Sequence, residues 1–204
     1  MENKKQNVIA LFISESWLLI VASLVFGLLL AGVNYALKPK IEANANSKQT
    51  EALKELLLDA QTFEKIVDNA SVENIASPVT VFKGVKNGMS AGWVFTATGP
   101  GYADKIDLLI AVDSGFEKIV GYKVLFSNET VGFGDKIKNP YYKDQFAGAP
   151  VEKLELLKMG DETVIDNNII AISGATISSN AVVEIFNTHL LNIKTQLKEK
   201  GLLQ

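Results

Sequence analysis

Ser173, Gly174, Ala175 and Thr176 form a run of small and hydroxyl-bearing residues late in the chain. The run follows an apolar, strand-like segment at residues 169–172 and opens a segment with helical spacing of apolar residues. A turn of this kind leaves backbone N–H groups unpaired at the positive end of a helix dipole, where anions bind well. The run therefore predicts a phosphate-binding turn. The competing interpretation is an ordinary helix cap, in which the hydroxyls serve stability alone.

A second candidate loop lies upstream, at residues 127–138. It contains Glu129, Thr130, Gly132 and Gly134. Two glycines so close together predict a tight loop with positive φ, or a close approach of a ligand to the backbone. The alternative is a simple surface turn.

Composition narrows the chemistry that these loops can perform. The net charge of −3 gives no electrostatic footprint for nucleic acid. All 20 basic residues are lysines, so no guanidinium fork can hold a phosphate. The absence of cysteine excludes disulfides, thiolate nucleophiles and Cys-ligated iron–sulfur clusters, and a single histidine leaves too few ligands for a zinc site built on His and Cys. Any redox chemistry must therefore come from an organic cofactor.

An uncharged stretch of 21 residues lies at positions 17–37. At ~1.5 Å per residue it is about long enough to cross ~30 Å of hydrocarbon, and Trp17 and Tyr35 lie near its ends, where amphipathic rings favour the interface. We predict an uncleaved membrane anchor over residues 1–40. A cleaved signal peptide is the alternative, but its apolar region is shorter. Lysines on both sides of the stretch leave its orientation open.

Residues 41–78 are predicted to link this anchor to a globular domain over residues 79–204. Helical spacing at residues 48–66 predicts a helix. This helix either links the anchor to the domain or, equally, packs on the surface of the domain core. Beyond it, β-prone runs alternate with turns, and an amphipathic helix ends at Gly201. This order predicts an α+β domain with an antiparallel sheet and helices on its faces. The expected elements are strands at 79–82, 91–98, 106–112 and 119–126, the last two joined as a hairpin, short helices at 140–147 and 151–157, and the final helix after Ser179.

Four motifs follow the apolar stretch in order. They are Gly-Pro-Gly-Tyr at 99–102, a turn at 113–115, Glu-Thr-x-Gly-x-Gly at 129–134 and Ser-Gly-Ala-Thr at 173–176. Together they resemble the FMN-binding domain shared by the G subunit of the Rnf electron-transport complex and the C subunit of the sodium-translocating NADH:quinone reductase. The resemblance covers about residues 92–190. The length of the chain favours the Rnf protein, because the quinone-reductase protein is generally longer.

The resemblance implies a covalent cofactor. In that family the last Thr of Ser-Gly-Ala-Thr carries FMN through a phosphoester bond, which implies Thr176 as the attachment residue. A flavin transferase installs the cofactor from FAD, and the domain lies on the outer, or periplasmic, face of the bacterial cytoplasmic membrane. Two positions depart from the family pattern, because Ile170 stands in place of an acidic residue and Val131 in place of a proline.

A hypothesis for how the cofactor lies follows from the residues around Thr176. Ser173 and Ser178, with nearby backbone N–H groups, are expected to solvate the phosphate, and the ring is expected to lie against the Glu129 loop. Leu125 and Phe133 are expected to give apolar contacts. The other residues expected at the cofactor are Gly174, Ala175, Ile177, Thr130, Gly132 and Gly134.

The implied function is that of an electron carrier in a membrane complex. The complex passes electrons from reduced ferredoxin to NAD⁺ and couples this transfer to Na⁺ or H⁺ movement. The expected partners are the other Rnf subunits, the flavin transferase and the lipid bilayer. The alternatives are a C subunit of the quinone reductase, another membrane-anchored flavoprotein, and a non-redox binding module.

Overall fold

The computed structural model describes residues 2–72, 75 and 77–203. The chain divides into two compact units, Met1–Ser47 and Lys48–Gln204. Residues 73, 74 and 76 of the predicted linking segment lie outside the described residues.

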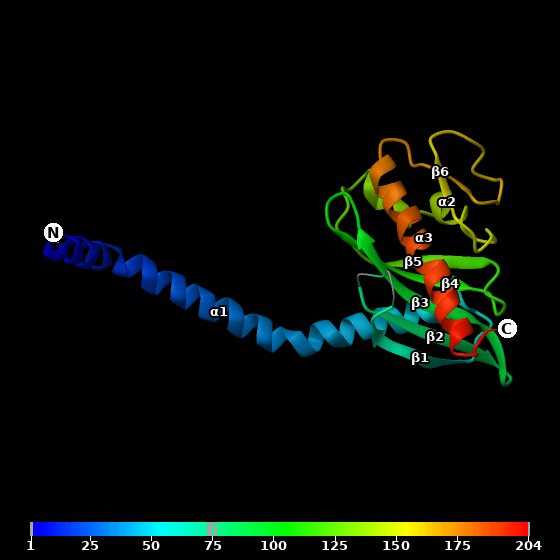
Figure 1. Cartoon of the computed structure of the whole chain (residues 1–204), viewed down its shortest axis with the longest axis horizontal. Coiled ribbons are helices and arrows are strands. Elements are labelled where there is room, and N and C mark those ends of the chain that lie inside the picture. The colour runs from blue at the N-terminus through cyan, green and yellow to red at the C-terminus, as the bar shows by residue number, and fades with distance from the viewer. Residues whose placement is uncertain (1, 73–74, 76, 204) are drawn as a thin grey trace. The chain divides into compact units, whose positions relative to one another are not determined.

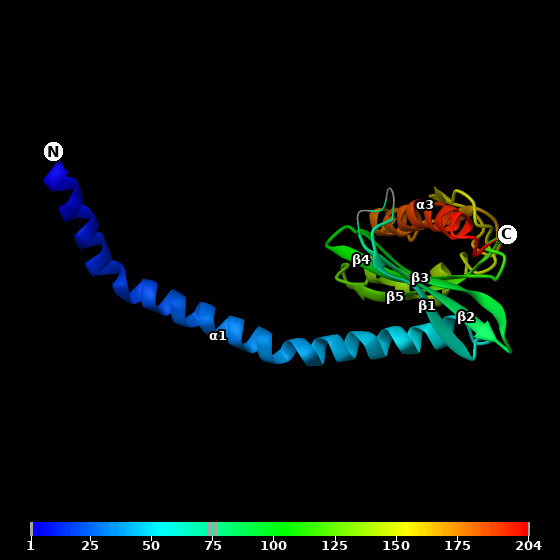
Figure 2. The same ribbon diagram turned by 60° about the horizontal axis from the view of Figure 1, so that its bottom comes forward.

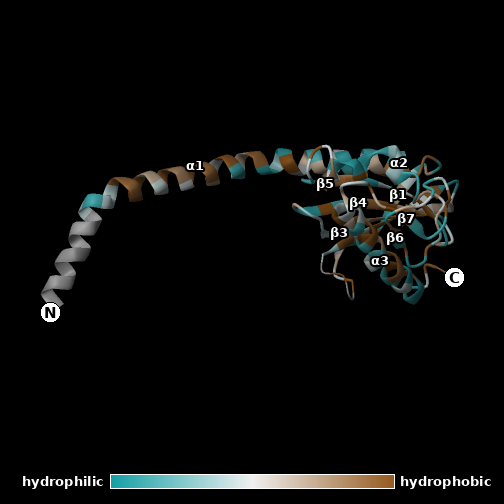
Figure 3. Cartoon of the chain, turned by 90° about the horizontal axis from the view of Figure 1, so that it is seen from above, coloured by the Kyte–Doolittle hydropathy of each residue, from teal (hydrophilic) through white to brown (hydrophobic). Residues whose placement is uncertain are grey.

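A single long helix, α1 (Glu2–Leu56), begins the chain. Figure 3 shows its apolar stretch as a brown band, and the side chains of that stretch are exposed to the surroundings of the helix. Within the described residues, α1 is the one helix whose length and composition suit a membrane crossing. The helix continues through Pro39, past the lysines that end its apolar part.

The helix predicted at residues 48–66 ends at Leu56, so the prediction is wrong for its last part. A turn follows, and residues Thr62–Ala70 form strand β1, which pairs antiparallel with β2 (Val79–Lys86). Pairing with a neighbouring strand decides the conformation here, because propensity and periodicity are weak where tertiary contacts compete.

The domain is built on a five-stranded antiparallel sheet in the order β1-β2-β3-β4-β5 (Figure 1). The other three strands are β3 (Met89–Pro100), β4 (Lys105–Val112) and β5 (Ile119–Ser127). β4 and β5 form the predicted hairpin, which is confirmed. The predicted α+β class with an antiparallel sheet is also confirmed.

Both faces of this sheet are covered. Trp93 and Phe95 point into one apolar cluster and Val94 into another, because successive side chains of a strand face opposite sides. The first cluster lies beneath the final helix, α3 (Thr176–Glu199), which crosses the sheet in Figure 2. The second receives Ala52, Leu53 and Leu57 at the end of α1.

Between β5 and α3 the chain forms short elements that lead to the turn before α3. These are η1 (Gly134–Lys138), α2 (Pro140–Lys143), β6 (Glu155–Leu157) and β7 (Asn168–Ile170). The helix predicted at 140–147 is therefore confined to its first turn.

The helix predicted at residues 151–157 is wrong, because this segment ends in β6, which pairs parallel with β7. The Asn187 side chain of α3 accepts a hydrogen bond from the Leu154 N–H at 2.8 Å and donates one to the Leu154 carbonyl at 3.0 Å. These bonds take the backbone groups that a helix would use internally.

Candidate functional site

The turn that opens α3 leaves backbone N–H groups without hydrogen-bond acceptors at the start of the helix. Thr176 is the first helical residue, and the residue before it, Ala175, has only a methyl group and makes no capping hydrogen bond. The interpretation of this turn as an ordinary hydroxyl cap therefore does not hold. The N–H groups of Thr176, Ile177 and Ser178 precede the first residue with an intrahelical acceptor, and the Thr176 side chain is exposed.

Ser179, which was not among the predicted site residues, fixes the shape of this turn from below. Its buried hydroxyl accepts a hydrogen bond from the Ile172 N–H at 3.0 Å and donates one to the Ala175 carbonyl at 3.0 Å. Gly174 reverses the chain with φ +79°, a conformation that glycine adopts without steric cost. Thr176 is thus exposed to solvent on a turn that these hydrogen bonds hold in one conformation.

Glu129 joins two of the four sequence motifs to the first turn of α3. Its side chain is only 5% exposed, and one carboxylate oxygen accepts hydrogen bonds from the backbone N–H groups of Tyr102 at 2.9 Å and Ala103 at 3.0 Å. The other oxygen accepts a hydrogen bond from the Ser178 hydroxyl. One buried carboxylate thereby fixes the Gly-Pro-Gly-Tyr turn, the Glu129–Gly134 loop and the first turn of α3 to one another.

Two glycines make room for this carboxylate. A Cβ on Gly134 would lie 2.5 Å from Ser178 Oγ and 2.8 Å from Glu129 Oε2, and a Cβ on Gly101 would overlap Glu129 Oε1. These two glycines therefore leave space for contacts within the protein at Glu129, and not for a ligand. Gly132 differs, because its φ of +81° is the positive value predicted for this loop, which is confirmed.

Gly134→Ala is expected to destabilise the fold by about 1–3 kcal/mol, because the added methyl group overlaps the Ser178–Glu129 contact and must push it apart. Urea unfolding of the purified full chain measures the change. Gly115→Ala is the matched control, since its Cβ would meet only Glu117 at 3.6 Å and Asp113 at 4.0 Å. Equal losses in the two variants would contradict the close approach at Gly134.

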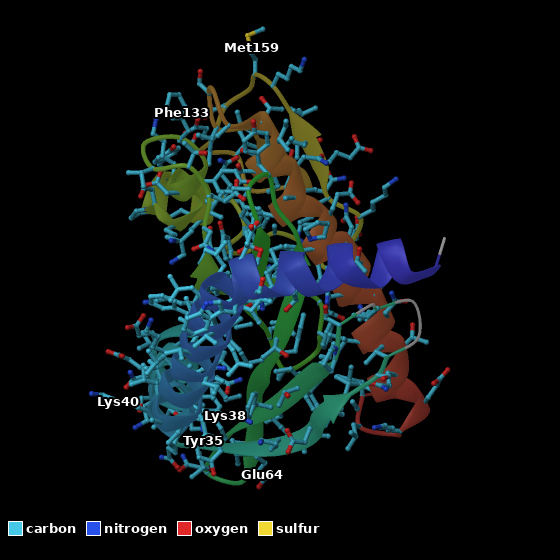
Figure 4. All side chains as sticks on the ribbon, turned by 90° about the vertical axis from the view of Figure 1, so that its left-hand side faces the viewer. Tyr35, Lys38, Lys40, Glu64, Phe133 and Met159 are labelled. Carbon is cyan, nitrogen blue, oxygen red and sulfur yellow. The ribbon has the colours of Figure 1, made fainter. Side chains whose placement is uncertain are left out.

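Three of the four sequence motifs enclose a cleft of about 540 Å³, within the range of small-molecule sites. Apolar side chains at its rim are well exposed, at 64% for Tyr102, 54% for Phe133 and 59% for Ile177. Figure 4 shows Phe133 at the same end of the domain as Met159 and opposite Glu64. The cleft thus offers apolar surface for a planar ring beside unpaired N–H groups for an anion, which fits FMN. It is lined by Tyr102, Thr130, Phe133, Gly134, Gly174, Ala175, Thr176, Ile177 and Ser178.

Most of the predicted cofactor residues meet at this cleft, but four do not line it. Glu129 is buried behind the wall of the cleft, where it binds Tyr102 and Ser178. Ser173 is exposed in the adjoining turn, and Gly132 lies in the loop beyond the rim. Leu125 packs against the apolar cluster on the opposite face of the sheet. Tyr102 lines the cleft but was not among the predicted cofactor residues. The Gly-Pro-Gly-Tyr motif that contains it was the sequence feature that could have indicated it.

His189 lies outside the cleft, on the inner side of α3. Its side chain is 1% exposed, and Nδ1–H donates a hydrogen bond to the Ile185 carbonyl at 2.8 Å. Burial lowers the pKa of His189 below its ordinary value, because the interior disfavours the imidazolium. His189 therefore packs in the interior of the domain and does not line the cleft.

Stability is expected to fall as the pH drops below about 6.5, because the unfolded chain then binds a proton at His189 more strongly than the folded chain. Urea unfolding between pH 7.5 and 5.5 measures this. His189→Gln should give a flatter dependence over the same range, since His189 is the only histidine. A variant as pH-sensitive as the parent chain would contradict the assignment.

Comparison with known proteins assigns the region of the cleft to a known domain family. Residues 101–190 match the FMN-binding domain, and every residue that lines the cleft falls inside this range. Over 180 residues the chain is 33% identical to the G subunit of the ion-translocating oxidoreductase complex of Methanosarcina acetivorans, and the match covers 87% of this chain and 92% of that protein. The chain belongs to the family of G subunits of ion-translocating oxidoreductase complexes. The predicted resemblance to the G subunit of the Rnf complex and its FMN-binding domain is confirmed.

One further relative supports this family membership, and one solved structure shows the fold. The chain is 34% identical over 181 residues to the G subunit of the Na(+)-translocating ferredoxin:NAD(+) oxidoreductase complex of Acetobacterium woodii, covering 83% of this chain and 86% of that one. The crystal structure of Shewanella oneidensis NqrC is similar, with a TM-score of 0.54 and 24% identity over 70% of this chain and 73% of that one. This chain and NqrC therefore share a fold.

Proposed function

We propose that this chain is the electron-carrying subunit of a membrane-bound oxidoreductase complex and holds FMN through a phosphoester bond to Thr176. The observation that carries the proposal is the place of the Thr176 hydroxyl. It is exposed on the first residue of α3, at the edge of a cleft inside the FMN-binding match.

The first turn of α3 suits a bound phosphate. The unpaired N–H groups of Thr176, Ile177 and Ser178, together with the helix dipole, stabilise negative charge at this point. Ser173 is exposed next to them and supplies a further hydroxyl. Tyr102, Phe133 and Ile177 would then cover part of the ring, and the flavin supplies the electron transfer when bound.

The proposed attachment reaction forms one bond and breaks one bond. The bond formed joins Thr176 Oγ1 to the FMN phosphorus of FAD, and the bond broken is the pyrophosphate linkage. AMP leaves, and the hydroxyl proton is released. A flavin transferase would catalyse this exchange, and an exposed hydroxyl on a rigid turn is open to such an enzyme.

Covalent attachment suits a carrier on the outer face of the membrane. A freely dissociating cofactor would be lost by dilution there, whereas a bond keeps its local concentration independent of the free pool. We place the domain on that face, with α1 as its anchor in the bilayer. The names of the relatives support a role between ferredoxin and NAD⁺, with other subunits of the complex moving Na⁺ or H⁺.

Intact mass of the full chain tests the proposal. The protein is purified in detergent from cells that make the flavin transferase, and a denaturing gel is viewed under ultraviolet light. The expected mass exceeds that of the bare chain by FMN less one water, and fluorescence survives denaturation. A bare mass from these cells contradicts covalent flavin.

A further inference from the structure

We propose that the negative charge of Glu129 lowers the reduction potential of the flavin in the cleft, in addition to holding the wall of the cleft together. The inference rests on the proposed function, because it needs a flavin bound beside Thr176. It assigns Glu129 as a positioning and tuning residue that does not touch the reacting ring.

Glu129 lies directly behind the cleft wall. Its carboxylate oxygens contact the Tyr102 N–H and the Ser178 hydroxyl, and a Cβ on Gly134 would almost touch them. All three of these residues line the cleft. The charge is therefore separated from the bound cofactor by a single layer of protein.

The charge of this carboxylate is weakly screened. Glu129 is 5% exposed, and none of the ion pairs among the described residues includes it. Its hydrogen bonds come from two backbone N–H groups and one hydroxyl. Dipoles rather than a cation compensate the charge, and burial keeps solvent ions away from it.

Such a charge opposes reduction of the ring. A flavin that accepts two electrons and one proton gains one negative charge, which a neighbouring carboxylate repels. Glu129 also faces the first turn of α3 through Ser178, so it offsets part of the positive helix end that would favour reduction.

Three other charged side chains lie nearby. Asp104 is exposed, Asp135 is half-buried, and the half-buried Lys136 places its ammonium 6.0 Å from the centre of the Phe133 ring. Lys136 acts in the opposite direction to Glu129. Asp104 and Lys136 are more open to water than Glu129 and are therefore screened more strongly. Asp135 has a buried Oδ1 and carries a charge of the same sign as Glu129.

Glu129→Gln separates the charge from the hydrogen bonds. The amide keeps the shape of the side chain, its oxygen accepts from the Tyr102 and Ala103 N–H groups, and its nitrogen donates to Ser178 Oγ. The midpoint potential is measured by spectroelectrochemical titration of the flavinylated full chain. An upward shift relative to the parent chain is expected.

Glu117→Gln is the matched control, because it neutralises an exposed carboxylate outside the residues that line the cleft. Its potential should stay close to that of the parent chain. An unchanged potential in Glu129→Gln, or equal shifts in both variants, overturns the proposal. A parent chain without covalent flavin overturns the proposed function as well, which distinguishes the two failures.

Two surface variants keep the test valid if Glu129→Gln does not fold. Thr130 is exposed, lines the cleft and follows Glu129 in the chain. Thr130→Asp should lower the midpoint potential and Thr130→Lys should raise it. Identical potentials in this pair would show that charge at this wall does not reach the ring, which contradicts the inference.

Discussion

Thr176→Ala is expected to give a folded protein that carries no covalent flavin. The side chain is exposed and makes none of the hydrogen bonds that shape the turn, which depend on the Ser179 hydroxyl and on backbone groups. Removing the hydroxyl therefore removes the acceptor for FMN while leaving the fold intact. Intact mass and fluorescence in a denaturing gel measure the loss, and circular dichroism checks the fold.

Two variants locate the attachment. Thr176→Ser keeps a hydroxyl at the same place and should retain covalent flavin, whereas Ser173→Ala removes an exposed hydroxyl three residues away and should have little effect. Flavin that persists in Thr176→Ala would move the bond to another residue and contradict the proposed site.

Phe186→Ala is expected to cause the largest loss of stability, about 3–5 kcal/mol. The Phe186 ring is fully buried on the inner face of α3, and its centre lies 4.7 Å from that of Phe146 and 5.5 Å from that of Tyr122. Truncation leaves a cavity among these rings and loses their edge and face contacts. Urea unfolding of the full chain, followed by circular dichroism, measures the change.

Leu191→Ala is the matched control for this prediction. Leu191 lies on the same helix but is 47% exposed, so its truncation should change stability by only about 0.5 kcal/mol. Similar losses at both positions would show that the inner face of α3 does not anchor the helix to the sheet. In that case the position of Thr176 would depend on other contacts.

Local patterns in the sequence predicted much of the fold. The β4–β5 hairpin was visible because apolar runs flank a turn of Asp113, Ser114 and Gly115. The final helix was visible because its buried residues recur at steps of three and four, and its predicted start lay four residues after Thr176. The turn that opens α3 was visible because a run of small and hydroxyl residues precedes the helical pattern.

Contacts between distant residues explain what the sequence did not reveal. Residues 151–157 looked helical, but Asn187, more than 30 residues later, binds the backbone at Leu154. Glu129 was predicted at the site without its bonds to Ser178 and Tyr102, which are formed only when the fold brings three loops together. Leu125 packs on the face of the sheet away from the final helix, and local patterns did not reveal this because the face of a strand residue depends on register.

The packing of Leu53 and Leu57 against the sheet decides where a water-soluble fragment can be cut. A fragment starting at residue 79 would lack both β1 and the segment that contains Leu53 and Leu57. Phe82, Val94 and Leu109 would then form an exposed hydrophobic patch that is prone to self-association. Cutting at Lys48, just before the last two turns that cover this surface, removes the membrane stretch and keeps its cover. In this protein the tail of the anchoring helix is also part of the interior of the flavin domain.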